Sequence, residues 1–426
     1  MSILSILILF TVIIRAFKTG ITYDEGYTCL EYSRIGDLCS GNPLLGTLGG
    51  TSKFFGFLVP ILANNHPLNS LLVSIFSLPD PFNECLIRLP NIIFCVIYMV
   101  ISILLISRIS LKWLAFSLLL LNYYVIDFFG LARGYGIACS LMLIALYRYY
   151  RFSYSRSDIL FILYTLVLAC YGQLICVPVF IMLCIDLVIS HSKNGIIEFL
   201  HSSFYHLTAI VIAFIYACIF LHTVTEQGLP LYGSSKNFYS AVISSYLSMI
   251  LPSFTNNYHL YITVLTVSML CLPLFIKTNV GNFRIWRLMI GSFALIAVSS
   301  MILNKPLPTG RVLIPLWPLV VMSIIEICEG YYPRLNAKGK IAAHALSIVI
   351  MAALSMNFIS HLSLSSTEFC RDQYPLKAEV YNHYKENNCI SLKYMDNYTV
   401  LFYMEKIKKE NKVQLEFCND CVFGPK

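Results

Sequence analysis

Long apolar stretches, repeated along most of the chain, are the feature that most constrains its fold. A helix needs about 20 mostly apolar residues to cross the hydrocarbon core of a bilayer. Segments that approach this length lie at about 2–17, 89–107, 113–130, 134–150, 158–175, 177–190, 204–222, 259–276, 288–303, 312–328 and 341–360. Charged residues make up only 12% of the 426 residues, about half the share found in soluble domains. The sequence therefore predicts an all-α polytopic membrane protein with about 11 transmembrane helices.

A further apolar stretch at 238–252 differs from these segments in its many Ser and Tyr residues. This composition favours an interfacial or re-entrant helix, and a full span is the alternative.

Lysine and arginine predict the orientation, because short cytoplasmic loops of membrane proteins carry an excess of both. If the first loop lies outside, five short inside loops hold twelve of these residues. They are Arg108, Lys112, Arg148, Arg151, Arg156, Lys193, Lys277, Arg284, Arg287, Arg334, Lys338 and Lys340. The short outside turns hold only Arg133, Lys305 and Arg311, although Arg15 and Lys18 flank the first span on the opposing side. We expect the N-terminus inside and the C-terminus outside.

Two segments are then large and external. Residues 18–88 form a first loop, and residues 361–426 form a polar and charged tail, long enough for a small α/β subdomain. The predicted division is a transmembrane module at 1–360 and an external C-terminal subdomain at 361–426. The net charge of +8 is explained by the inside loops, so we expect no nucleic-acid partner.

The first loop carries polar residues in a specific order. TYDEGYTCLEYSRIG, with Asp24 and Glu25, directly follows the first span; NNHPLNSLL, with His66, comes next; LIRLPNIIF, with Arg88, opens the second span. Each piece alone has an ordinary structural interpretation, such as an acidic helix cap.

This arrangement resembles the glycosyltransferase C superfamily, and most closely its branch of protein O-mannosyltransferases and lipid A aminoarabinose transferases. GLARGYGIACSLMLIALYRYY (130–150) and PLPTGRVLIPLWPL (306–319) also look like family segments. The resemblance covers about 1–150 well and 300–330 fairly, and His66-Pro67-Leu68 has one proline where the family often has two.

The resemblance implies an inverting enzyme of the bacterial plasma membrane. It would transfer a hexosyl or pentosyl group from a polyprenyl-phosphate donor to a hydroxyl of a protein, lipid or glycan. Asp24 matches the family's general base, with Glu25 orienting Asp24 or the acceptor. A divalent cation, Mg²⁺ or Mn²⁺, at Asp24 or Asp127 is left open.

The expected substrate contacts lie in other outside turns as well. Asp127 is expected to contact the sugar or a metal and Arg133 the phosphate, unless the two form a bracing ion pair. Arg311, among Pro306, Pro308, Pro315 and Pro318, is the first choice for the phosphate, because arginine binds phosphate through a planar fork; snorkelling to headgroups is its alternative. His66 is a further phosphate or sugar candidate, Tyr27 a candidate for stacking on a sugar, and Arg88 an expected interfacial anchor.

Three other classes of protein share the apolar composition. A transporter should show repeated halves and ionisable groups near mid-membrane, and a polysaccharide polymerase or ligase should carry its catalytic loop late in the chain. A non-catalytic scaffold would not need Asp24, Asp127, Arg133 and Arg311 at one face. These patterns favour the transferase.

Overall fold

Within the described residues, four helices are long and apolar enough to cross a membrane. The computed structural model describes residues 2–32, 66–151, 155–192, 211, 215, 238–250, 283–302, 304, 306–362, 373–387, 390–391, 398–412 and 417–418. The four are α5 (Glu84–Ile106), α15 (Arg284–Ile302), the stretch Gly310–Arg334 and α17 (Ala337–Ser360). Gly310–Arg334 consists of η6 (Gly310–Leu316), α16 (Trp317–Tyr331) and η7 (Tyr332–Arg334). The multi-pass architecture is thus confirmed.

Two bent helix pairs raise the number of candidate spans in this part of the chain to six. α1 (Ser2–Lys18) meets α2 (Tyr23–Tyr32) at 69°, and α6 (Lys112–Leu120) meets α7 (Tyr123–Asp127) with η3 (Phe128–Gly130) at 47°. The span predicted at 113–130 is thus a bent pair of helices, which counts as one candidate span. The cause of the bend is local, because Asn122 caps a new helix by accepting a hydrogen bond from the Val125 N–H.

The remaining spans form helices close to their predicted lengths or lie outside the described residues. The segments near 134–150, 158–175 and 177–190 form α8 (Gly134–Tyr150), α9 (Arg156–Gly172), η4 (Leu174–Cys176) and α10 (Val177–Ser192). These three α-helices have 17, 17 and 16 residues. The span expected at 204–222 (apart from positions 211 and 215) and the one at 259–276 lie outside the described residues. The predicted number of eleven is therefore not reached in the part described.

The apolar stretch at 238–252 forms two short elements rather than a full span. They are η5 (Tyr239–Ile243), a π-helical turn, and α13 (Ser244–Ile250). α4 (Pro67–Phe76) is also short, and it begins with Pro67 in its first turn. Pro is suited to this position because its missing N–H would have no partner in the helix.

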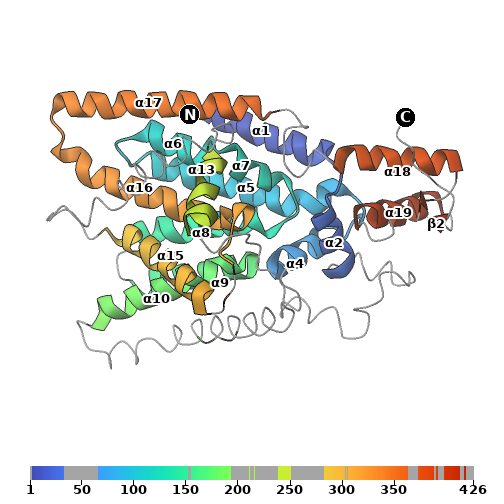
Figure 1. Cartoon of the computed structure of the whole chain (residues 1–426), viewed down its shortest axis with the longest axis horizontal. Helices are drawn as coiled ribbons and strands as arrows, with labels where there is room; N and C mark the ends of the chain where they lie inside the picture. The colour runs from blue at the N-terminus through green and yellow to red at the C-terminus, as the bar shows by residue number, and fades with distance from the viewer. Residues whose placement is uncertain are drawn as a thin grey trace.

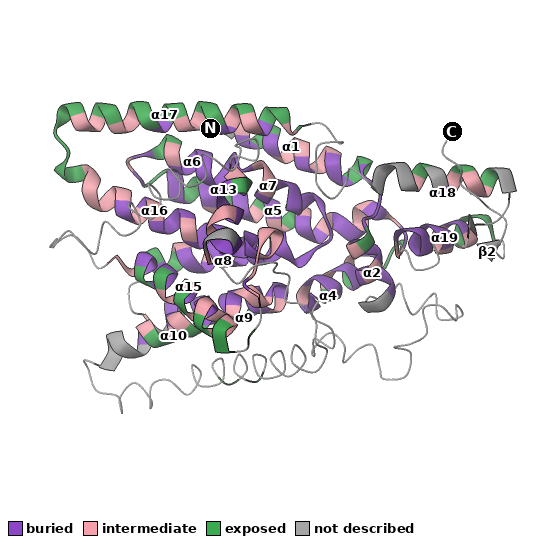
Figure 2. Cartoon of the chain, in the orientation of Figure 1, coloured by how far each residue is buried: buried purple, intermediate pink, exposed green. Residues whose placement is uncertain are grey.

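The largest cluster of buried apolar side chains joins α5, α6, α8, α9 and α16. Figure 2 shows these helices buried and α17 exposed along most of its length. Most exposed residues of α17 are themselves apolar, with Ile341, Val349 and Met356 each more than 60% exposed. An apolar surface of this kind fits lipid contact.

The C-terminal tail folds into two helices and a minimal sheet. α18 (Gln373–Asn387) and α19 (Tyr398–Asn411) accompany a parallel pair of two-residue strands, β1 (Ile390–Ser391) and β2 (Phe417–Cys418). In Figure 1 α19 lies beside α2, and α18 packs on α19. The tail therefore packs at the end of the bundle where the first loop begins.

The loops that we expect on the inside lie together at the other end of the helix bundle, where hydrogen bonds and ion pairs connect them. Glu329 accepts hydrogen bonds from Ser110, the Tyr149 hydroxyl donates to Asp186, and Arg287 pairs with Asp186 at 3.5 Å. α8 runs from Gly134 to Tyr150, about 25 Å at 1.5 Å per residue. This length separates the loops from the end that holds Asp24 and Arg133.

Arg15, which opposed the predicted orientation, is not a surface charge. Its side chain is only 7% exposed and forms an ion pair with Asp127, and it also donates to the main-chain carbonyl of His361. A positive charge neutralised inside the protein does not act as a loop charge.

Candidate active site

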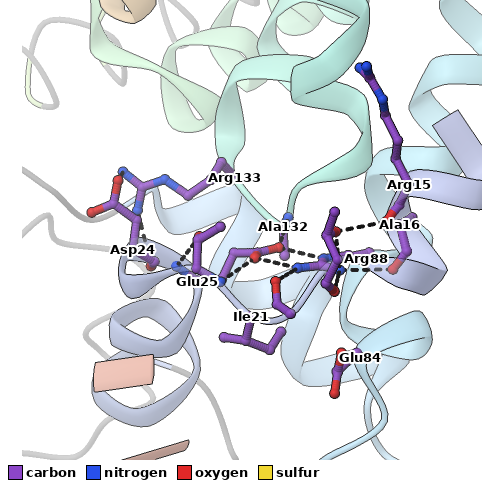
Figure 3. Close-up of polar contacts among 12 residues, drawn as sticks. Arg15, Ala16, Ile21, Asp24, Glu25, Glu84, Arg88, Ala132 and Arg133 are labelled. Carbon is purple, nitrogen blue, oxygen red and sulfur yellow. Dashed lines mark hydrogen bonds and ion pairs between the residues drawn. The ribbon is translucent and has the colours of Figure 1, made fainter. Parts of the chain in front are cut away.

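Three residues predicted from separate parts of the sequence meet at Asp24. Asp24 lies in the first turn of α2, and its carboxylate oxygen Oδ2 is 3.2 Å from an Arg133 nitrogen and 2.9 Å from an Arg311 nitrogen. Figure 3 shows Arg133 turned toward Asp24. The carboxylate is 14% exposed, so the cluster lies close to the surface of the protein. One carboxylate is thus in contact with two guanidinium cations.

Arg133 is held rigidly at the start of α8. It is the N-cap residue, its side chain is 2% exposed, and Nη1 also donates to the main-chain oxygen of Asp24 at 3.2 Å. The next residue, Gly134, lets the start of α8 pack closely on Gly172 and His66. A Cβ at Gly134 would overlap the Gly172 carbonyl oxygen and the His66 side chain.

Arg311 lies in η6, whose first residues are held by side chains of α13. Gly310, with φ +54°, donates its N–H to the Ser245 hydroxyl at 2.8 Å. The Tyr246 hydroxyl donates to the Leu313 carbonyl at 3.1 Å. A positive φ suits glycine, which has no Cβ to clash. α13 therefore fixes the turn that carries Arg311.

Glu25 faces away from Asp24 into a buried ion pair with Arg88. Both side chains are 0% exposed, and Glu25 Oε2 is 2.6 Å from Arg88 Nη2 while Oε1 is 2.7 Å from Nε. The carboxylate also accepts the N–H groups of Ala132 at 2.6 Å and Thr22 at 2.9 Å. Of the two roles expected for Glu25, contact with an acceptor does not fit this burial, whereas orientation of Asp24 does.

The interpretation of Arg88 as an interfacial anchor is wrong. Besides Glu25, its guanidinium donates to the carbonyls of Ala16, Thr19 and Gly20 at 2.7–2.8 Å. Figure 3 shows these contacts around Arg88. The last carbonyls of a helix have no hydrogen-bond donor within the helix. Arg88 provides the donors for the carbonyls where α1 ends. It therefore stabilises the bend that leads to Asp24.

His66 lies beside the cluster as a neutral side chain. It is buried at the start of α4, its Nε2 is 3.2 Å from Nε2 of Gln173, and its ring meets Tyr135 edge-on. Burial, and then the positive charges of Arg133 and Arg311, hold the pKa of His66 well below its usual value. At neutral pH it can therefore offer a hydrogen bond but not a positive charge.

Asp127 and Arg133 do not brace the turn by pairing with each other. Asp127 pairs with Arg15, and Arg133 with Asp24. The Tyr123 ring stacks on His361 with centroids 4.0 Å apart, which brings the end of α17 to the same place. The structure thus places Asp127 in a buried contact between α1, α7 and the end of α17.

Tyr27 contacts another aromatic side chain. Its ring meets the ring of Tyr398 edge-on with centroids 4.8 Å apart, and Tyr23 does the same at 5.4 Å. The Tyr27 side chain is only partly buried.

The described residues contain no group of three or more His, Cys, Asp or Glu side chains that could hold a metal ion. Asp24 instead has two arginines as partners, and a guanidinium does not ligate a cation. This donor set does not fit a metal bridge between Asp24 and a phosphate, so no chemical step is assigned to a metal.

Several residues at the site were not expected from the sequence. Arg15 and Gln173 are single polar residues within apolar stretches, and Ser245 is one of several Ser residues in the stretch at 238–252. Polar groups at membrane depth are costly and usually have partners, so their positions were a usable signal. Tyr398 had no such signal, because nothing in the sequence connects the tail to the first loop.

Comparisons with known proteins found similarity to solved structures alone. No protein-family model matches the chain, and no curated protein matches it. The chain is similar to crystal structures of ArnT from Cupriavidus metallidurans in the apo state and bound to undecaprenyl phosphate. The TM-scores are 0.49 and 0.48 and the sequence identities 12% and 11%; each match covers 94% of this chain and 74% of the other.

Proposed function

We propose that this chain is a membrane glycosyltransferase that moves a sugar from a polyprenyl-phosphate donor to an acceptor hydroxyl at the outer face of the membrane. The observation that carries the proposal is the meeting of Asp24 with Arg133 and Arg311 at one end of a bundle of apolar helices. A lipid-linked donor keeps its phosphate at the lipid–water boundary, where an enzyme must gather both a base and cations.

The proposed reaction is a single displacement. The acceptor oxygen attacks the anomeric carbon, its proton passes to the Asp24 carboxylate, and the bond between the anomeric carbon and the phosphate oxygen breaks. The electron pair leaves with the phosphate, whose negative charge Arg133 and Arg311 stabilise. Attack opposite the leaving group inverts the anomeric centre.

In this proposal, Asp24 and the donor phosphate both bind the same two arginines, Arg133 and Arg311. Without donor, both guanidinium groups contact the carboxylate at 3.2 and 2.9 Å. A bound phosphate offers the same guanidinium groups further anionic oxygens, which they can bind bidentately. We infer that donor binding moves these groups from Asp24 to the phosphate and so frees the carboxylate to accept the proton.

We assign roles in substrate binding to the other sequence-predicted residues. His66 is a hydrogen-bonding contact for phosphate or sugar, and Tyr27 a stacking surface. Asp127 can contact a sugar hydroxyl while paired with Arg15, because an ionised carboxylate accepts about four hydrogen bonds.

A transporter is the less favoured alternative. Its binding groups should lie near mid-membrane, whereas the ion pairs of the described helices lie at their ends. Arg88 pairs with Glu25, and Arg133 with Asp24, where α5 and α8 begin, and Arg148 pairs with Asp158 where α8 ends. This distribution fits chemistry at a membrane face.

The first test concerns the orientation, with the N-terminus inside. Cysteine introduced for Lys385 on α18 should react with an impermeant thiol reagent in intact cells, whereas cysteine introduced for Lys338 should react only after lysis. Both positions are exposed, so accessibility within the protein is matched. The measurement is labelling in a background without other reactive thiols. The reverse pattern would place Asp24 on the cytoplasmic side and contradict the proposal.

The second test concerns the donor phosphate. Arg311→Ala should weaken binding of polyprenyl phosphate to the purified protein by about 30- to 5,000-fold, since removing one partner of a buried, hydrogen-bonded charge pair costs about 2–5 kcal/mol. Arg334→Ala, an exposed arginine beyond the other end of α16, is the matched control and should bind as wild type. Equal affinities for the two variants would remove Arg311 from the phosphate site.

A further inference from the structure

Helix α19 of the C-terminal tail packs against the helix that carries Asp24. Figure 1 shows α19 beside α2, and Figure 2 shows α19 mostly buried although it lies at the edge of the molecule. Its buried side chains run from Thr399 to Met404 and include Ile407. Those from Val400 to Met404, and Ile407, share one apolar cluster with Ile21, Cys29 and Leu30 and with Ala132, the neighbour of Arg133.

The main chains of the two helices touch at Gly26. A Cβ at Gly26 would lie 2.6 Å from the Tyr398 carbonyl oxygen and 2.8 Å from its carbon, too close for any side chain larger than hydrogen. The Tyr398 ring lies edge-on to Tyr23 and Tyr27, one helical turn apart on either side of Gly26. The contacting residues of α2 lie on both sides of Asp24 in the sequence, so α2 has little freedom to slide along α19.

A hydrogen bond connects α19 to the bend before α2. The Tyr403 hydroxyl accepts the Ile21 N–H at 2.7 Å, and Tyr403 itself is fully buried. Residues 19–22 form this bend, and Arg88 binds the carbonyls of Thr19 and Gly20 from another direction. The bend is therefore held between α5 and the tail.

Charge contacts attach the tail to α5 as well. Glu84, at the first position of α5, is 2.8 Å from Lys377 Nζ and 3.2 Å from Lys406 Nζ. Glu84 lies one helical turn before Arg88. The tail thus contacts the same two elements that the buried Glu25–Arg88 pair joins.

We propose that α19 is a positioning element of the active site, in which Tyr398 and Tyr403 set the place of Asp24 relative to Arg133 and Arg311. The inference rests on the proposed function. Arg133 and Arg311 belong to α8 and η6, so a shift of α2 would move the base more than it moves the phosphate contacts. Disturbing α19 should therefore lower kcat and leave donor affinity nearly unchanged.

The experiment compares Gly26→Ala, Tyr398→Ala and Tyr403→Phe with Asn382→Ala, an exposed position on α18. Each purified full-length variant is titrated with polyprenyl phosphate, which counts the folded sites and gives Kd. Transfer from a polyprenyl-phosphate sugar is then expressed as kcat per binding site. Counting sites separates a loss of position from a loss of folded protein.

We expect kcat per site to fall about 100-fold in Gly26→Ala, the size of effect that a misplacement near 1 Å produces. The fall in Tyr403→Phe should be roughly tenfold or less, as for one hydrogen bond, and Asn382→Ala should match wild type. Unchanged kcat per site in both Gly26→Ala and Tyr398→Ala would overturn the positioning role. If Gly26→Ala yields no folded protein, Tyr398→Ala, which keeps the main chain, decides the question. Failure of the wild-type protein to bind polyprenyl phosphate would instead overturn the proposed function.

Discussion

Replacing Asp24 by Asn should reduce transfer by about 100- to 10,000-fold, the usual contribution of a positioned general base. The amide keeps the size and shape of the carboxylate but cannot accept the acceptor's proton at neutral pH. Binding of polyprenyl phosphate should survive and become tighter, because Arg133 and Arg311 lose the carboxylate that competes for them at 3.2 and 2.9 Å. The measurements are single-turnover transfer and equilibrium binding on the same purified protein.

Asp80→Asn is the control for this substitution. Asp80 is a half-exposed carboxylate on the turn before α5, 3.6 Å from Lys409, and its loss should leave both transfer and binding unchanged. An Asp24→Asn protein that transfers sugar at a near-normal rate would show that Asp24 is not the base. A protein that lost donor binding as well would indicate that Asp24 organises the arginines rather than the proton transfer.

The residues of the candidate site could be found from the sequence because each lies next to a membrane boundary. Asp24 follows the first apolar stretch, Arg133 opens one, and Arg311 opens another among prolines. Charge is costly within the bilayer, so ionisable residues at such boundaries are few and conspicuous. Position along the chain indicated which end of the bundle they share, and the structure adds that Asp24 contacts both arginines.

The partners within the site could not be found in this way. Glu25 and Arg88 are separated by 63 residues, and either one reads as an ordinary boundary charge. Their pairing depends on the bend between α1 and α2, which requires a tertiary partner for the carbonyls at the end of α1. The sequence likewise does not show that Arg15 is a buried, paired charge rather than a loop charge, because its partner Asp127 lies 112 residues further along the chain.

The fold was predictable where hydrophobicity alone determines the structure. Apolar stretches predicted the helices, but the bend at Asn122 depends on one side chain accepting one N–H. The docking of α19 on α2 depends on the absence of a side chain at Gly26. Neither effect changes the average hydrophobicity of a segment. Residues 33–65, nearly half of the first loop, lie outside the described part of the chain.

Breaking the buried Glu25–Arg88 pair should have the largest effect on folding. Arg88→Ala should lower the free energy of unfolding by about 3–5 kcal/mol, because removing one partner leaves the other charge buried and uncompensated. The three main-chain carbonyls at the end of α1 also lose their donor. The measurement is denaturant unfolding of the purified protein in detergent, with Arg334→Ala as the exposed control.

The double variant Glu25→Gln with Arg88→Met separates the charge from the carbonyl contacts. Removing both charges should recover part of the stability lost in Arg88→Ala, because no ion is then left buried, while the carbonyls at the end of α1 stay without their donor. A double variant no more stable than Arg88→Ala would assign the whole effect to the carbonyls. Arg88→Ala with wild-type stability would mean that the bend before Asp24 is held by α19 alone. Polyprenyl phosphate binding by the folded fraction should stay close to normal in each variant, since Arg88 contacts Glu25 and the end of α1 and Arg311 contacts Asp24.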